Sequence, residues 1–202
     1  MSTATKNRTT TDNHALAQAV HDLGSALWFG GAVMGMAGVN KAGRDLPQGI
    51  DRIRVANSAW SRFGPVEWAG VASTLLAGSR LTQSSSQRLA AQQGFARTGA
   101  AKAVVAALGA AATAFATYSG SRIGKLAEEA EARGEKIEVK DAATPSELTP
   151  PDIAAWQRRQ RIAQVAVPVL TGANIVLGSY LVQSYRTAAT VKGIKNRLLP
   201  GR

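Results

Sequence analysis

Hydrophobic and polar residues are segregated along this chain into long blocks. Four blocks hold few or no charged side chains, and polar, arginine-rich segments separate them. A helix of about 20 apolar residues is long enough to cross the hydrocarbon core of a membrane. The sequence therefore predicts an all-α fold, a four-helix transmembrane bundle with helical extensions outside the membrane. The four helices are expected at about 15–40, 63–81, 99–121 and 162–185.

The last two blocks distinguish a membrane bundle from a soluble one. Lys102 and Arg122 enclose 19 uncharged residues, and 24 more lie between Arg161 and Arg186. A soluble bundle needs a charged stripe on the outer face of each helix. Neither block contains such a stripe, and a chain of 202 residues is too short to bury these helices on all sides. We therefore expect a multi-pass protein of the cell (plasma) membrane, in contact with the lipid bilayer.

Small residues recur at helical spacing within the blocks. The first block holds five glycines, each of which destabilises a helix in water by roughly 1 kcal/mol. In lipid the same glycines let a neighbouring helix approach closely, as in the G-x-x-x-G pair of Gly31 and Gly35. Trp28 and Phe29 are expected to pack in the core of the bundle. The glycines predicted to pack helices together are Gly24, Gly31, Gly35, Gly70, Gly78, Gly109 and Gly172.

The two ends of the chain are polar. Residues 1–13 are predicted to be a mobile polar tail, with Asn13 as the N-cap of the first helix. Residues 187–202 are predicted to be a basic tail. A single membrane domain, residues 14–186, remains between the two tails.

Residues 122–161 form the longest hydrophilic segment and are predicted to be a loop that is partly helical. Its first part continues the third block as a helix to about Gly134, and Thr149 and Pro150 are typical of the N-cap and first residue of the next helix. Residues 50–60 fit two interpretations. They form either a short helix on the membrane surface or an extension that leads into the second block.

Charge indicates the orientation and the kinds of partner. The net charge is +11, with 24 lysines and arginines against 13 acids. Basic segments beside membrane helices attract anionic lipid headgroups, which we expect as partners in preference to nucleic acid. The counts of Lys and Arg on the two sides are about equal and do not decide the orientation. The larger net positive charge lies on the side of the termini, so both termini are predicted to be cytoplasmic. Cysteine is absent, which excludes disulfide bonds and thiolate metal sites.

Four polar residues within the predicted spans are candidates for function: His21, Asp22, Glu67 and Asn174. His21 could bind a metal or haem or relay protons, or it could lie with Asp22 near the headgroups. Because Pro65 precedes it, Glu67 is expected in the first turn of its helix, near the opposite membrane face, where a carboxylate stabilises free N–H groups. A proton or cation site is the alternative for Glu67. Asn174 is expected to bond to another helix, or else to line a polar cavity.

The segment from His21 to Trp28 and Gly31 has the pattern H-x6-W-x-G-G. This pattern resembles a signature of small bacterial membrane proteins, including helices of copper-resistance-D-like proteins. With Met34-Gly35, Asn40-Lys-Ala and the segment 164–172, the chain resembles uncharacterised actinobacterial four-helix integral membrane proteins. The resemblance implies a four-helix membrane fold and no particular activity.

No nucleotide-binding, protease or hydrolase motif occurs in the sequence. We therefore predict that the chain is not an enzyme and has no catalytic residue, metal or cofactor. The leading hypothesis is a small membrane protein with a structural or accessory role. Its Gly/Ala helix faces would pack against a second copy, as a homo-oligomer, or against a larger membrane complex. The alternative is a transporter, or a metal or redox accessory protein, that uses His21, Asp22 and Glu67.

Overall fold

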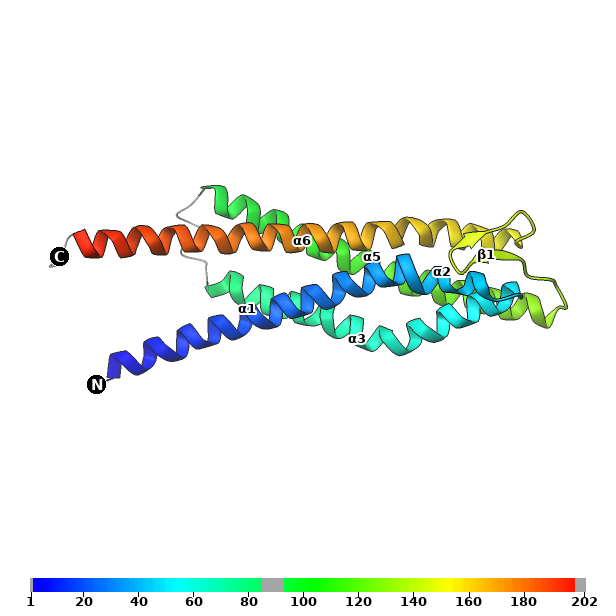
Figure 1. Cartoon of the computed structure of the whole chain (residues 1–202), viewed down its shortest axis with the longest axis horizontal. Helices are drawn as coiled ribbons and strands as arrows, with labels where there is room; N and C mark the ends of the chain where they lie inside the picture. The colour runs from blue at the N-terminus through cyan, green and yellow to red at the C-terminus, as the bar shows by residue number, and fades with distance from the viewer. Residues whose placement is uncertain (1, 85–92, 199–202) are drawn as a thin grey trace.

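Four long helices form the protein in the computed structural model, and short elements connect them at one end (Figure 1). The structure describes the backbone of residues 2–84 and 93–198 and the side-chain surroundings within 14–84 and 96–183. The long helices are α1 (Ser2–Met34), α3 (Gly49–Ser84), α5 (Gln93–Ala132) and α6 (Pro151–Leu198). A π-helical turn η1 (Gly35–Val39), the short α2 (Asn40–Ala42) and the 3-10 turn η2 (Gly43–Asp45) follow α1. Strands β1 (Val139–Asp141) and β2 (Thr144–Pro145) form an antiparallel hairpin before α6.

The all-α class is confirmed, but the helices are longer than the hydrophobic blocks. Helix α1 begins at Ser2 and so takes in residues that the sequence predicts as a tail. Helix α3 begins at Gly49, so residues 50–60 are the extension into the second block and not a separate surface helix. Helical backbone needs no apolar side chains, which is why hydropathy alone underestimates its extent. The predicted basic tail lies partly in α6, and residues 199–202 are outside the described residues.

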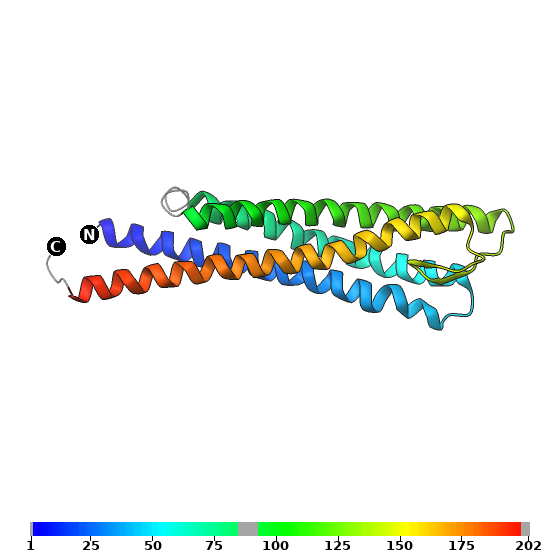
Figure 2. The same cartoon turned by 90° about the horizontal axis from the view of Figure 1, so that it is seen from above.

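The helices pack as two antiparallel pairs, α1 with α3 and α5 with α6. Helix α6 also lies along α1, and α3 along α5, so the four helices close into one bundle (Figures 1 and 2). Helix α1 begins and α6 ends at the same end of the bundle. The hairpin and the turns after α1 lie at the opposite end.

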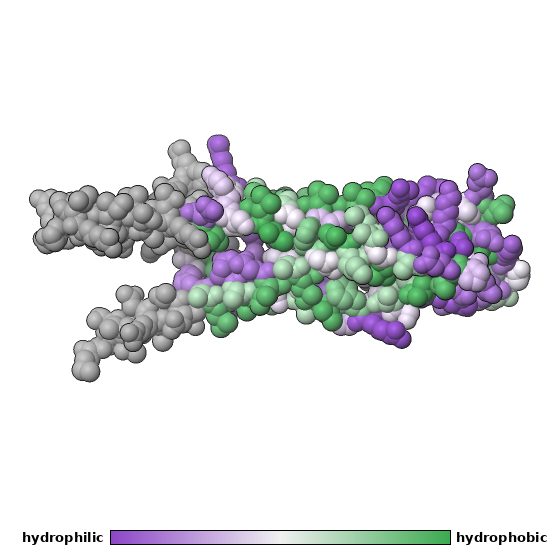
Figure 3. Space-filling model, viewed as in Figure 1, coloured by the Kyte–Doolittle hydropathy of each residue, from purple (hydrophilic) through white to green (hydrophobic). Residues whose placement is uncertain are grey.

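The middle of the bundle is apolar outside, and its interior holds several polar side chains beside a small apolar cluster around Trp28. Large hydrophobic side chains from all four long helices are exposed there and form the apolar belt (Figure 3). The belt includes Leu23, Leu27, Leu76, Leu108, Phe115, Val169 and Val176. Buried at the same level are His21, Ser25, Glu67, Thr74, Thr113, Thr171 and Asn174. A soluble protein has the reverse arrangement, because water favours charged side chains outside.

Within the described residues, two stretches are long and apolar enough to cross a membrane. They are Ala96–Ala132 and Pro151–Gln183, with mean hydropathies of 1.5 and 1.8 in their most apolar windows. Only 17% and 22% of those windows is buried, whereas the core helix of a soluble protein is mostly buried. The predicted spans at 15–40 and 63–81 do not reach the same apolarity, so the structure does not confirm four spans. Their buried polar residues lower their mean hydropathy.

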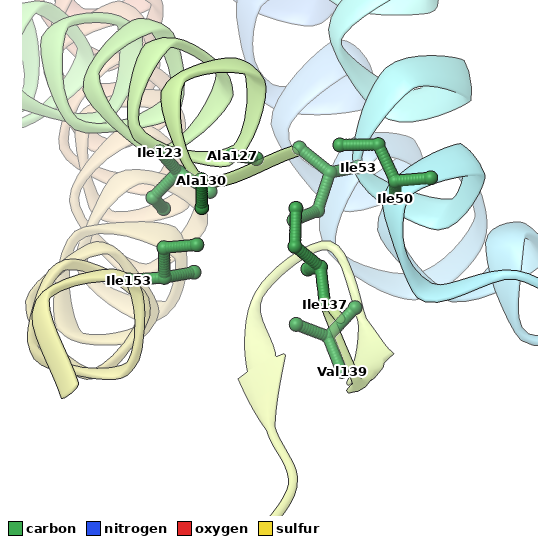
Figure 4. Packing of buried hydrophobic residues seen from close by; sticks show 8 residues of the cluster. All are labelled: Ile50, Ile53, Ile123, Ala127, Ala130, Ile137, Val139 and Ile153. Carbon is green, nitrogen blue, oxygen red and sulfur yellow. The ribbon is translucent and has the colours of Figure 1, made fainter. Parts of the chain in front are cut away.

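The opposite end of the bundle is a small folded head, with its own apolar core. The head consists of η2, the start of α3, the end of α5, the hairpin and the start of α6. Its core side chains point toward one another from these elements (Figure 4). They are Ile50, Ile53, Ile123, Ala127, Ala130, Ile137, Val139 and Ile153.

Buried polar contacts hold the hairpin against the helices of the head. Asp141 is buried, and its Oδ2 accepts hydrogen bonds from Arg44 Nε at 3.0 Å and Arg44 Nη2 at 2.6 Å. Its Oδ1 accepts the backbone N–H of Ala143 at 2.9 Å. Gln157 on α6 donates to the carbonyls of Asp141 and Ala142, both at 3.1 Å. The hairpin was not predicted, because its strands have only three and two residues.

Of the two helix ends beside the hairpin, the end of α5 agrees with the sequence prediction and the start of α6 does not. Helix α5 ends at Ala132, and Gly134 follows in the left-handed region with φ 75°, as the predicted end near Gly134 requires. The prediction for Thr149 is wrong, because α6 begins at Pro151. The hydroxyl of Thr149 instead accepts the backbone N–H of Ser146 at 2.8 Å, so it stabilises the turn before the helix.

The predicted packing glycines lie against side chains and backbone of this same chain. A Cβ at Gly31 would lie 2.5 Å from the ring of Phe63, and one at Gly35 would lie 2.1 Å from the ring of Trp60. A Cβ at Gly24 would lie 2.9 Å from the carbonyl oxygen of Gly70. Gly78 faces His21, Gly109 faces Trp28 and Gly172 faces Phe29. The glycines therefore close the bundle internally.

Replacing Gly31 with leucine tests this packing. We expect Gly31→Leu to lower the free energy of unfolding by about 1–3 kcal/mol, because the new side chain must displace the ring of Phe63. Gly30→Leu is the matched control, since a Cβ at Gly30 meets nothing within 4 Å. The measurement is thermal unfolding of both variants in the same detergent. Equal stability of the two variants would contradict the packing described here.

Candidate functional site

The polar interior of the bundle is the candidate site, and His21 lies at its end nearest the termini. The His21 side chain on α1 is 3% exposed. Lys102 Nζ on α5 lies 2.7 Å from His21 Nε2, and His21 Nδ1 lies 3.1 Å from Asp22 Oδ1. An ammonium group can only donate, so Nε2 accepts and Nδ1 carries the proton that is donated to Asp22. His21 thus bridges a cation and an anion as a neutral ring.

Neighbouring residues make room for this cluster. Gly78 on α3 leaves space for the imidazole, and Gly178 on α6 leaves space for the lysine, whose Cε would lie 3.2 Å from a Cβ there. Gln18 Nε2 donates to Asp22 Oδ1 at 2.8 Å. The four helices therefore all contribute to the surroundings of His21. The sequence identifies His21 and Asp22 but treats Lys102 only as the boundary of a block.

One turn deeper, three polar side chains from three helices meet. Ser25 Oγ on α1 lies 3.3 Å from Thr74 Oγ1 on α3, and Asn174 Nδ2 on α6 donates to Ser25 Oγ at 3.5 Å. We call these three residues the inner layer. All three are at least 97% buried. The structure thus places Asn174 in a contact between helices, and its Oδ1 has no partner among the described residues.

Trp28 connects α1 to α5 below the inner layer. Its indole Nε1 donates to Thr113 Oγ1 at 3.0 Å, and its ring packs over Gly109. Trp28 is 1% exposed, and it contacts Ala32, Val71 and Val167 in an apolar cluster. The sequence predicts that Trp28 packs in the core, and its ring does so. The sequence does not predict its hydrogen bond, because the acceptor, Thr113, lies 85 residues further along the chain.

Glu67 lies elsewhere than the sequence predicts. Because α3 begins at Gly49, Glu67 is in the middle of a helix and not in its first turn, so it cannot cap free N–H groups. It lies along α3 between the contacts of Phe63 with Gly31 and of Gly70 with Gly24, and is therefore inside the bundle. Its side chain is 5% exposed, and it bonds to no other described residue. The expectation that it does not pair with His21 agrees with this position.

A cleft of about 300 Å³ opens beside His21 between α1 and α6, and we call it the terminal cleft. The carboxylate of Asp22, which is 62% exposed, lies in its wall. The other lining residues are Gln18, His21, Ser25, Ala26, Ile175, Gly178, Ser179, Val182 and Gln183. Because Ser25 lines the terminal cleft, the cleft extends to the inner layer.

This geometry favours hydrogen-bonding and proton chemistry over metal binding. Both ring nitrogens of His21 are occupied, one by Lys102 and one by Asp22. In the part of the chain that the structure describes, no three His, Cys, Asp or Glu side chains gather as metal ligands would. An ammonium next to Nε2 also repels a metal ion.

Comparisons with known proteins identify no relative, so the function is inferred from the residues and geometry of this chain. No protein-family model, curated protein or solved structure matches this chain. The resemblance to actinobacterial four-helix membrane proteins therefore stays a prediction.

Removing the hydroxyl of Thr113 tests whether the buried contacts hold the bundle together. We expect Thr113→Val to lower the free energy of unfolding by about 1–3 kcal/mol, because the buried indole N–H of Trp28 loses its acceptor. Thr117→Val is the control, since both threonines donate to the carbonyl four residues earlier but only Thr113 accepts from Trp28. Thermal unfolding in detergent measures both. A loss of stability no larger for Thr113→Val than for Thr117→Val would rule out this role.

Proposed function

We propose that this chain is a multi-pass membrane protein with a structural or accessory role. In this proposal all four long helices cross the bilayer at the apolar belt, and the head lies at one membrane face. The observation that carries the proposal is a row of exposed alanines on α5, within the belt. The row presents a smooth face to a second membrane helix.

The apolar belt supports four crossings instead of two. Leu23 and Leu27 on α1 and Leu75 and Leu76 on α3 are exposed beside the apolar faces of α5 and α6. Since α1 packs along α3 and α6, a bilayer around α5 and α6 surrounds α1 and α3 as well. The buried polar residues that lower the hydropathy of α1 and α3 face the interior, away from lipid.

The alanine face of α5 is the surface that suits association with another membrane helix. The row is Ala100, Ala103, Ala107, Ala111 and Ala114, spaced by three and four residues and exposed throughout. Small residues at this spacing let two helices approach closely in lipid, where van der Waals packing drives association. The glycines are already used inside the bundle, so the alanine face is the part of the Gly/Ala surface that remains for a second copy or a larger complex.

Charge supports an orientation with both termini in the cytoplasm. Helix α1 begins and α6 ends at the same end of the bundle, and the basic part of α6, residues 186–198, lies at that end. Basic residues there suit the anionic headgroups of the cytoplasmic leaflet. The head then lies at the outer face of the membrane.

Membrane integration predicts a simple fractionation. In a detergent-free lysate the full chain should sediment with the membranes and stay in the pellet through an alkaline carbonate wash, because the apolar belt is unstable in water. Mild detergent should release it as a folded protein. A folded, monodisperse chain in the supernatant would exclude the membrane assignment.

If the chain associates through α5, a phenylalanine at position 107 should disrupt the assembly and one at the adjacent position 108 should not. In mild detergent the wild-type chain should migrate as an assembly larger than one copy, and Ala107→Phe should dissociate it because the ring prevents close approach. Leu108→Phe, at a neighbouring exposed position that already carries a large side chain, should leave the assembly intact. Size-exclusion chromatography with light scattering measures both. A wild-type chain that is single and without partners, or an assembly that Ala107→Phe leaves intact, would contradict the accessory role.

A further inference from the structure

Glu67 is an acid without a counter-charge in the middle of the bundle. It is 5% exposed, and none of the described residues bonds to its carboxyl group. The neighbouring helices carry no charged residue over 23–40, 103–121 and 162–185. A buried carboxylate without a partner is unfavourable, so this position favours the neutral acid, which holds a proton. An ionisable residue placed in this way within a membrane bundle more often has a function than a packing role.

Two polar layers lie on either side of Glu67. Trp60, Glu67 and Thr74 follow one another on α3 at intervals of seven residues, so they share a face and are roughly 10 Å apart along the helix axis. Thr74 belongs to the inner layer. Trp60 Nε1 donates to Asn40 Oδ1 at 3.0 Å, and we call this pair the head-side layer.

Each layer contains one buried side-chain atom that lacks a partner among the described residues. These atoms are Asn174 Oδ1 in the inner layer and Asn40 Nδ2 in the head-side layer. Both residues are at least 97% buried. A buried polar atom without a protein partner is commonly satisfied by an internal water molecule. The two layers are therefore among the positions where water is expected, together with the Oε1 atoms of Gln157 and Gln160 on α6, which also lack a partner among the described residues.

Clefts approach Glu67 from both ends of the bundle. The terminal cleft reaches Ser25, which contacts Thr74 of the inner layer. A second cleft of about 410 Å³, the head cleft, lies between α3 and α5 and extends to Ser61, six residues before Glu67. Pro65 has no N–H to offer the carbonyl of Ser61, so that carbonyl is open to water. Glu67 thus lies about midway between two clefts at opposite ends of the molecule.

A proton is the cation that this arrangement can hold. Binding of a sodium or calcium ion needs several oxygen ligands, and no second carboxylate lies within the uncharged stretches that surround Glu67. A single carboxyl group needs no further ligand to bind a proton. On α3 itself the nearest charged residue is Arg62, which is exposed and lies five residues before Glu67. On the other elements the nearest titratable groups are His21, Asp22 and Lys102 at the terminal cleft, and Lys41, Tyr118, Arg122 and Arg161 toward the head.

We propose that protons cross the bundle by way of Glu67. A proton from water in one cleft adds to the Glu67 carboxylate, and the resulting acid returns a proton to water in the other cleft. Because each layer is roughly 10 Å from Glu67, a transient chain of hydrogen-bonded water molecules must form beside the apolar cluster of Trp28 to carry the proton between the layer and the carboxyl group. No electron or other reactant takes part, so the movement follows the proton gradient. This inference goes beyond the structural or accessory role and does not depend on the alanine face.

Reconstituted vesicles test the proposal. The purified full chain is placed in phosphatidylcholine–phosphatidylglycerol vesicles that contain a pH-sensitive dye, and a potassium gradient with valinomycin drives proton entry. We expect the wild-type chain to acidify the vesicles several-fold faster than empty vesicles. Glu67→Gln, which has the same shape but cannot exchange a proton, should return the rate to that of empty vesicles. Glu147→Gln removes an exposed acid of the head and should keep the wild-type rate.

A chemical measurement separates proton binding from a structural role of Glu67. Dicyclohexylcarbodiimide adds to protonated carboxyl groups in apolar surroundings, so it should modify Glu67 in the wild-type chain and stop the flux. Should Glu67→Gln fail to fold, Glu67→Asp keeps an acid and should retain measurable flux that the carbodiimide stops. A wild-type rate equal to that of empty vesicles, a wild-type rate in folded Glu67→Gln, or flux that persists after complete modification of Glu67 would each overturn the proposal.

Discussion

The close approach of α1 to α3 is the contact on which the rest of the bundle depends. The backbones meet at Gly24 and Gly70, and aromatic rings of α3 fill the spaces at Gly31 and Gly35. These contacts fix the register of the two helices over several turns, because a shift of one residue would place Cβ atoms where backbone or rings now lie. The register then decides which polar side chains meet.

Polar side chains buried inside a helix bundle must find partners from other helices, since bulk water does not reach them. The register of α1 and α3 places Ser25 opposite Thr74 and His21 opposite Gly78. Helices α5 and α6 then complete these sites with Lys102 and Asn174. The buried bonds therefore specify how the two helix pairs fit together, while the glycines specify how α1 and α3 fit to each other. Glu67 is the buried acid that this register leaves without a partner among the described residues.

The sequence predicts which positions on each helix pack closely better than it predicts which side chains of different helices contact each other. Glycine spacing identifies positions such as Gly31 and Gly35 correctly, because close packing depends on local spacing along one helix. The partner of His21 is 81 residues away, and no pattern along the chain connects the two. The sequence misplaces Glu67 because Pro65 is typical of a helix start, whereas in the structure Pro65 lies within the continuous helix α3. The hairpin of the head is missed since its strands are held by Asp141 and Gln157, not by a hydrophobic pattern of their own.

The continuity of α5 and α6 links the head to the part of the bundle that carries the apolar belt. Helix α5 carries the alanine face in the belt and, further along, Ile123, Ala127 and Ala130 of the head core. A rotation of α5 about its axis would therefore turn both regions together. Helix α1, in contrast, gives way to a π-helical turn at Gly35–Val39 before the chain reaches the head, so it does not continue into the head as α5 does. In the proposed assembly, contacts made by the alanine face would reach the head through α5 and its partner α6, whereas α1 is joined to the head through the short elements η1, α2 and η2.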